Sequence, residues 1–168
     1  MKLFKTNVGT AVMFSSILII LTGCNVETQR AKDLRSGQSN GFITIDDNII
    51  NLDTIRMSDG NVDIPFTFKN AGDEPLVLLN GETSCMCTTA RVESDAGTSA
   101  LIVMRGHGPT ARIYHVIDPE EEAKLIATFD PNAHGPKGTG PIMRDITITT
   151  NSKRTPEVKF RFRGNVIP

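Results

Sequence analysis

From Gly41 onward, the apolar residues of this chain recur with a period of two, not with the period of about 3.6 that a helix requires. Short alternating stretches are separated by Gly, Asn, Asp and Pro, which favour turns. Ile64, Phe66 and Phe68, for example, can all point to one side of a strand. Many short strands at intervals of about 8 to 12 residues, without helices between them, predict an antiparallel β-sandwich.

The predicted strands follow one another along the whole segment. Leu76–Leu79 is apolar at every position, so we expect this strand to be more fully buried than the others. Helical propensity is confined to Pro119–Lys124, where glutamates and an alanine follow a proline, and it suffices for a single turn. The other predicted strands cover residues 42–46, 49–55, 64–69, 84–92, 100–105, 110–117, 124–130, 142–150 and 158–166.

The N-terminal residues predict where the protein is located. Two lysines precede an apolar run, Val8–Ile20, and Leu21-Thr22-Gly23-Cys24 resembles a bacterial lipobox. The run is shorter than the about 20 apolar residues that a membrane-spanning helix needs, and no charged stop-transfer cluster follows at once. We therefore expect residues 1–23 to be a lipoprotein signal peptide, and Cys24 to be the palmitate-bearing first residue of the mature chain.

The segment after the signal divides into a tether and one domain. Residues 24–40 are polar and lack apolar periodicity, which is typical of a flexible tether, and residues 41–168 are long enough for one domain with a hydrophobic core. Asn25 follows the lipidated position. In bacteria where Asp at this position retains lipoproteins in the inner membrane, Asn permits passage to the outer membrane. We expect a protein of the cell envelope, anchored in the outer membrane and facing the periplasm or the exterior.

The charge of the mature chain bears on its partners. Lys2 and Lys5 leave with the signal, so 16 of the 18 basic residues remain against 19 acidic ones. This balance argues against nucleic acid, which is bound through clustered basic residues. The expected partners are the membrane, through the lipid, and an unidentified envelope protein that binds exposed sheet edges.

Five short motifs of the predicted domain occur in the order found in one bacterial family. They are Phe66–Leu76, Ser84–Thr88, Ala127–Pro131, Ile148–Asn151 and Gly164–Val166. With these motifs the chain resembles domain-of-unknown-function family 1573, which is similar to immunoglobulin-like modules of the Hydin and ASH type and often occurs on bacterial lipoproteins. The resemblance covers most of Gly41–Pro168 and implies an immunoglobulin-like β-sandwich. It implies no biochemical activity, because none is established for the family.

The chain departs from this family in two places. The family usually has glycine between its two cysteines, whereas this chain has Met86, and a residue with a Cβ atom disfavours positive φ. We therefore expect a tight turn between Cys85 and Cys87 to be less favourable here. Residues 96–116 are extra sequence, and we expect them to form a protruding or sheet-extending β-hairpin, with strands at 100–105 and 110–117.

Cys85 and Cys87 are the sharpest chemical signal in the predicted domain. On a regular strand their side chains share one face and their Cα atoms lie about 6.5 to 7 Å apart. A disulfide requires about 4.4 to 6.8 Å, so a bridge across an extended Cys-Met-Cys would be strained. Three interpretations stay open. The pair is a structural feature, a redox-active couple, or part of a Cu(I) or Zn(II) site that uses both thiolates.

A third ligand would decide for the metal, since two ligands alone do not close a site. The candidates, if the fold brings their segments to the cysteines, are Met104, His107, His115 and His134. Met86 is a poor candidate because it points to the opposite face of a strand. The sequence contains none of the common hydrolase, zinc-protease, phosphate-loop or dinucleotide motifs, so no catalytic residue is assigned. Two hypotheses result: a noncatalytic, lipid-anchored interaction or structural module that needs no cofactor, and an extracytoplasmic thiol-redox or soft-metal protein.

Overall fold

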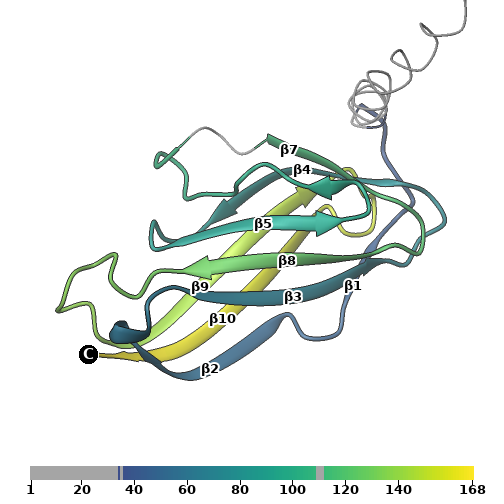
Figure 1. Ribbon diagram of the computed structural model, residues 1–168. Coiled ribbons are helices and arrows are strands. Elements are labelled where there is room, and N and C mark those ends of the chain that lie inside the picture. The colour runs from purple at the N-terminus through teal and green to yellow at the C-terminus, as the bar shows by residue number, and fades with distance from the viewer. Residues whose placement is uncertain (1–33, 35, 109–111) are drawn as a thin grey trace, which may run out of the picture.

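The computed structural model describes residues 34, 36–108 and 112–168, and it confirms the predicted immunoglobulin-like β-sandwich. Two sheets pack face to face (Figure 1). Their elements, in chain order, are β1 (Ile43–Ile45), β2 (Ile49–Arg56), the 3₁₀ helix η1 (Met57–Asp59), β3 (Val62–Asn70), β4 (Leu76–Thr83), β5 (Thr88–Ser94), β6 (Gly97–Thr98), β7 (Arg112–Ile117), β8 (Glu122–Phe129), β9 (Gly140–Thr150) and β10 (Glu157–Ile167).

The strand order is β1-β3-β8-β5-β6 in the first sheet and β2-β10-β9-β4-β7 in the second. Among the strand pairs of the described residues, only β2 and β10 run parallel. A parallel pair cannot be closed by a short hairpin. Here the two strands lie near opposite ends of the domain sequence, so the intervening strands supply the connection.

The core lies between the two sheets, and the predicted register of β3 is confirmed. Ile64, Phe66 and Phe68 are all buried, whereas Pro65 and Thr67 are exposed. Phe160 of β10 approaches from the facing sheet, with its ring centroid 5.4 Å from that of Phe66 and 5.7 Å from that of Phe68. Such tilted aromatic pairs stabilise a core beyond their buried area, so these three rings tie the sheets together.

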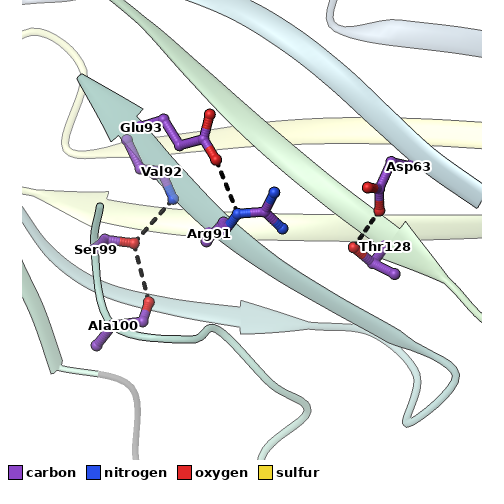
Figure 2. Close-up of polar contacts among 7 residues, drawn as sticks. All are labelled: Asp63, Arg91, Val92, Glu93, Ser99, Ala100 and Thr128. Atoms are coloured by element: carbon purple, nitrogen blue, oxygen red, sulfur yellow. Dashed lines mark hydrogen bonds and ion pairs between the residues drawn. The ribbon is translucent and has the colours of Figure 1, made fainter. Parts of the chain in front are cut away.

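The outer face of the first sheet is polar, as alternation requires. Figure 2 shows Arg91 and Glu93 of β5 in an ion pair, with 2.9 Å between Nε and Oε1, and the Thr128 hydroxyl donating to Asp63 across β8 and β3. The Ser99 hydroxyl accepts a hydrogen bond from the backbone N–H of Val92 at 2.9 Å and donates one to the backbone carbonyl of Ala100. Exposed pairs of this kind contribute little stability, and they leave the sandwich interior to the apolar residues.

The helical turn predicted for Pro119–Lys124 is wrong. Asp118 to Glu121 form a turn closed by a 3.1 Å hydrogen bond from Glu121 N–H to the Asp118 carbonyl, with φ of +63° at Glu120. Proline followed by a residue with positive φ is the geometry of a type II turn. Glu122 then begins β8 opposite Lys69, because the gain from sheet pairing outweighs the weak helical preference of three glutamates.

The extra segment 96–116 forms a hairpin at its beginning, where β6 pairs with β5 and extends the first sheet. Among the described residues, the pairing predicted between 100–105 and 110–117 is not formed, because the segment crosses between the sheets. Ile102 exchanges backbone hydrogen bonds of 2.7 and 2.9 Å with Ala90 and is fully buried. β7 pairs with β4 of the second sheet instead. Alternation alone could not show that the two halves of this segment join different sheets.

The described residues that precede β1 are attached to the domain. Ser39 pairs with Ser152 in an isolated parallel bridge, and its N–H donates to the Asn151 carbonyl at 2.9 Å. The Asn151 side-chain amide donates to the carbonyls of Leu34 and Gly37. The predicted signal peptide, Cys24 and most of the predicted tether lie outside the described residues. Among those described, no helix is long and apolar enough to cross a membrane.

Candidate metal centre

The two cysteines lie in the turn between β4 and β5. The N–H of Thr88 donates to the Cys85 carbonyl at 3.1 Å, which makes Met86 and Cys87 the central residues of the turn. The Thr83 hydroxyl lies within hydrogen-bonding distance of both the Cys85 and Thr88 carbonyls, at 3.1 and 2.9 Å. These contacts hold the turn against the ends of its flanking strands.

This turn corrects the prediction that the pair lies on a regular strand. Among the described residues other than glycine, positive φ occurs only at Asp53, Tyr114 and Glu120. Met86 therefore completes the turn with negative φ, so the missing glycine does not prevent it. Its side chain is exposed at the tip of the turn. Both cysteines are free thiols, with Cys87 buried and Cys85 partly buried.

Two neighbouring strands fix the position of the turn. The Ser84 N–H donates to the Asp145 carbonyl of β9, and the Ser84 hydroxyl accepts from the Asp145 N–H, both at 2.9 Å. On the other side, the Asp130 N–H at the end of β8 donates to the Cys87 carbonyl at 2.8 Å. The thiols therefore lie on a framework joined to both sheets.

The loop after β8 supplies a third donor atom. The Asp130 carboxylate accepts the Asn132 N–H at 2.8 Å, and the Asn132 side chain donates to the Met57 carbonyl at 3.0 Å. Gly135 follows with φ of +73°, a value that glycine adopts without strain. This folded loop and the Cys-Met-Cys turn lie at the same end of the sandwich (Figure 1).

His134 is thereby placed beside Cys85, with 3.2 Å between His134 Nε2 and Cys85 Sγ. One donor atom from each of Cys85, Cys87 and His134 lies within 4.8 Å of the other two. His134 is exposed, Cys85 is partly buried and Cys87 is buried, so the cluster opens to solvent on the His134 side. Two sulfurs and an imidazole nitrogen form a donor set that suits soft metal ions.

Arg144 of β9 completes the surroundings of the thiols, and the sequence analysis did not single it out. Its Nε donates to Cys87 Sγ at 3.1 Å, and its Nη1 donates to the Met143 carbonyl at 2.9 Å. Along β9, Arg144 shares the inward-facing register of Ile142, Ile146 and Ile148. A charge in the apolar register of a strand is visible in the sequence, and this signal could have identified it.

The electrostatics of the site distinguish the two thiols. Burial opposes ionisation of Cys85, but hydrogen bonds from Cys87 and His134 and the positive charge of Arg144 lower its pKa to about 7. Burial and the neighbouring Cys85 sulfur raise the pKa of Cys87, which Arg144 and Thr88 offset only in part. Cys85 is therefore the thiol that ionises first. It is also the more exposed of the two thiols.

The other candidate ligands lie elsewhere. His107 occupies an exposed turn in which its N–H donates to the Met104 carbonyl. His115 of β7 is buried, with its Nε2 2.8 Å from the Ser94 hydroxyl, and this burial lowers its pKa. Neither belongs to the cluster around the thiols in the described part of the chain. Of the three histidines, the fold thus brings only His134 to the cysteines.

Comparisons with known proteins place the fold. The solved structure of a protein of unknown function from Porphyromonas gingivalis W83 is similar to this chain with a TM-score of 0.55 and 18% sequence identity. The match covers 80% of this chain, which spans only 50% of the length of that protein. The ASH/PapD-like domain of human CEP192 (PapD-like domain 7) is similar at a TM-score of 0.45 and 13% identity, over 74% of this chain and 84% of that domain.

Sequence comparison identifies a family that part of the chain resembles. No curated protein matches this chain. The family model described as "Protein of unknown function (DUF1573)" matches residues 43–102, which include the first two of the five motifs and both thiols. The resemblance predicted from the sequence is thus confirmed: residues 43–102 of this immunoglobulin-like sandwich carry the DUF1573 sequence pattern.

Proposed function

We propose that this protein is a noncatalytic, lipid-anchored protein of the bacterial cell envelope, and that its immunoglobulin-like domain binds one soft metal ion through Cys85, Cys87 and His134. The observation that carries the proposal is the convergence of three donor atoms within 4.8 Å from two loops that are distant in sequence. A structural thiol pair needs no imidazole beside it. The third ligand therefore favours metal binding over the structural interpretation.

The spacing of the donor atoms suits one ion. Metal–sulfur and metal–nitrogen bonds of about 2.0 to 2.3 Å place ligand atoms around an ion about 3.3 to 4.0 Å apart. Cys85 Sγ and His134 Nε2 are 3.2 Å apart before any ion is bound, and every pair in the cluster lies within 4.8 Å. Small side-chain rotations of two thiols and one exposed imidazole suffice to bring all three into bonding distance.

We expect the full-length protein, purified in detergent under reducing and anaerobic conditions, to bind about one Cu(I) or Zn(II) per chain in competition with a chromophoric chelator. Replacing outer-shell partners alone costs about 10-fold to 100-fold in metal affinity, so the loss of a ligand in His134→Ala should cost about 100-fold or more. The matched control is His107→Ala, which removes an exposed histidine from another turn and should leave affinity unchanged.

The same experiment separates metal binding from dithiol redox chemistry. His134→Ala leaves both sulfurs in place, so a redox couple would keep its reversible oxidation while a metal site would lose affinity. Wild-type affinity in a Cys85→Ser, Cys87→Ser double variant would contradict the proposed site.

The lipid anchor has its own test. We expect Cys24→Ala to abolish incorporation of labelled palmitate and to leave an uncleaved or mislocalised precursor, because the lipobox supplies both the acylated sulfur and the cleavage site. Fractionation of the envelope with radiolabelled or clickable fatty acid measures this outcome. Cys85→Ser in the same strain is the matched control and should be acylated normally. Labelling of Cys24→Ala at the wild-type level would end the lipoprotein proposal.

A second candidate function is protein interaction through the sheet edges. In the described part of the chain, β1 and β6 end the first sheet and β2 and β7 end the second, so each of these edge strands has one side on which a partner strand could add. Ile49, at the start of β2, adds an exposed apolar side chain to one of these edges. Binding of an envelope partner that survives in the Cys85→Ser, Cys87→Ser double variant would support this candidate independently of the metal.

A further inference from the structure

Arg144 is positioned to set the charge of the proposed metal centre. Its Nε donates to Cys87 Sγ at 3.1 Å, and a second hydrogen bond, to the Met143 carbonyl, fixes the guanidinium in place. Its neighbour in sequence, Asp145, instead pairs with Arg161 through two hydrogen bonds of 2.6 and 2.8 Å. The positive charge of Arg144 is thus directed to a cysteine sulfur, although a carboxylate follows it in the chain.

We infer that Arg144 makes the site selective for a monovalent soft ion, Cu(I), over Zn(II). This inference rests on the proposed metal site and specifies which ion occupies it. Two thiolates carry a charge of about −2, and the imidazole of His134 adds none when it acts as a ligand. Cu(I) reduces this charge to −1, which the guanidinium neutralises. Zn(II) brings the charge to zero and leaves the guanidinium uncompensated.

Because the site is partly buried, the difference in net charge between the Cu(I) and Zn(II) complexes affects their relative stability. Cys87 is 2% exposed, and Arg144 is only partly exposed, so water screens their interaction less than it would at the surface. An uncompensated charge is costly in such surroundings, whereas a neutral assembly is not. Arg144 therefore stabilises the Cu(I) complex, which keeps a negative charge, and destabilises the Zn(II) complex, which does not.

The number of ligands points in the same direction. Protein zinc sites are almost always four-coordinate, and a fourth ligand would come from water or another group. The described residues offer three clustered donor atoms, and the guanidinium occupies one side of Cys87. Cu(I) favours soft thiolates and is satisfied by three ligands in a plane. Coordination and charge thus both favour Cu(I).

The test compares Cu(I) and Zn(II) affinities of the full-length protein, measured with chelator competition, in the wild type and in Arg144→Gln. A charge within about 4 to 6 Å changes the stability of an ionised group by the equivalent of about 10-fold to 1000-fold. We expect the ratio of Cu(I) to Zn(II) affinity to fall at least about 10-fold in Arg144→Gln. Arg163→Gln, which neutralises an exposed arginine of the adjacent β10, should leave this ratio unchanged.

Arg144→Lys keeps the charge without the Nε donor, and its ratio should stay within about threefold of the wild type. This variant also carries the test if Arg144→Gln does not fold, because a fall of about 10-fold in a folded Arg144→Lys protein would overturn the role of charge. An unchanged ratio in folded Arg144→Gln would overturn the inference while leaving the metal site intact. A wild-type protein that binds neither ion would instead refute the proposed function itself.

Discussion

Phe66→Ala is expected to lower the free energy of unfolding by about 3 to 5 kcal/mol. The Phe66 ring is 1% exposed and contacts Phe160 of the facing sheet, so its removal leaves a cavity between the two sheets. Surrounding strands cannot collapse into this space without losing their backbone pairing. Urea denaturation followed by circular dichroism measures the change.

The matched control for this cavity is Leu101→Ala. Leu101 is 55% exposed, and substitutions at such positions usually change stability by less than about 0.5 kcal/mol. Equal stability losses for the two variants would show that Phe66 does not lie in the core.

Asn70→Leu is expected to cost a comparable amount, about 3 to 5 kcal/mol, through hydrogen bonds instead of packing. Asn70 is fully buried at the end of β3. Its amide donates to the carbonyls of Glu74, Ile117 and Asp118, and its Oδ1 accepts from the N–H groups of Phe42 and Gly72. Leucine of similar size would fill the volume but could form none of these five hydrogen bonds with the surrounding backbone.

Asn80→Leu is the matched control, because the Asn80 side chain is exposed and makes a single 3.3 Å hydrogen bond to Thr149. Its effect should stay within about 0.5 kcal/mol in the same denaturation experiment. If Asn70→Leu were as stable as the wild type, the five hydrogen bonds of Asn70 would not contribute to the free energy of unfolding.

The sandwich was predictable because its strands bury one face each. Ile64, Phe66 and Phe68 lie in the core as their alternation predicts, and the apolar Leu76, Val77 and Leu78 are fully buried. Where the local preference for a helix conflicts with the pairing of strands, the prediction from the sequence is wrong. The glutamates after Pro119 favour a helix locally, but a turn that lets Glu122 pair with Lys69 gains a full strand of hydrogen bonds.

The candidate site was predictable only in its residue types. Cys85 and Cys87 were identified as a pair, but their placement in a turn depends on contacts with β8 and β9 that no local pattern contains. The proximity of His134 depends on the same long-range pairing, since β8 carries its loop to the thiols. Arg144 was missed, although a local pattern could have identified it: it is a charged residue in the same alternating register as the isoleucines of β9.

The attachment of Ser39 to Ser152 has a consequence for where the site meets other molecules. The described chain enters the sandwich at one end, and the cysteine turn lies at the other (Figure 1). From Ser152 to Arg144, the chain extends roughly 25 Å at about 3.3 Å per residue. The thiols thus lie roughly 25 Å from the point where the described chain enters the sandwich, so a donor or acceptor of the ion can approach them without contacting that segment.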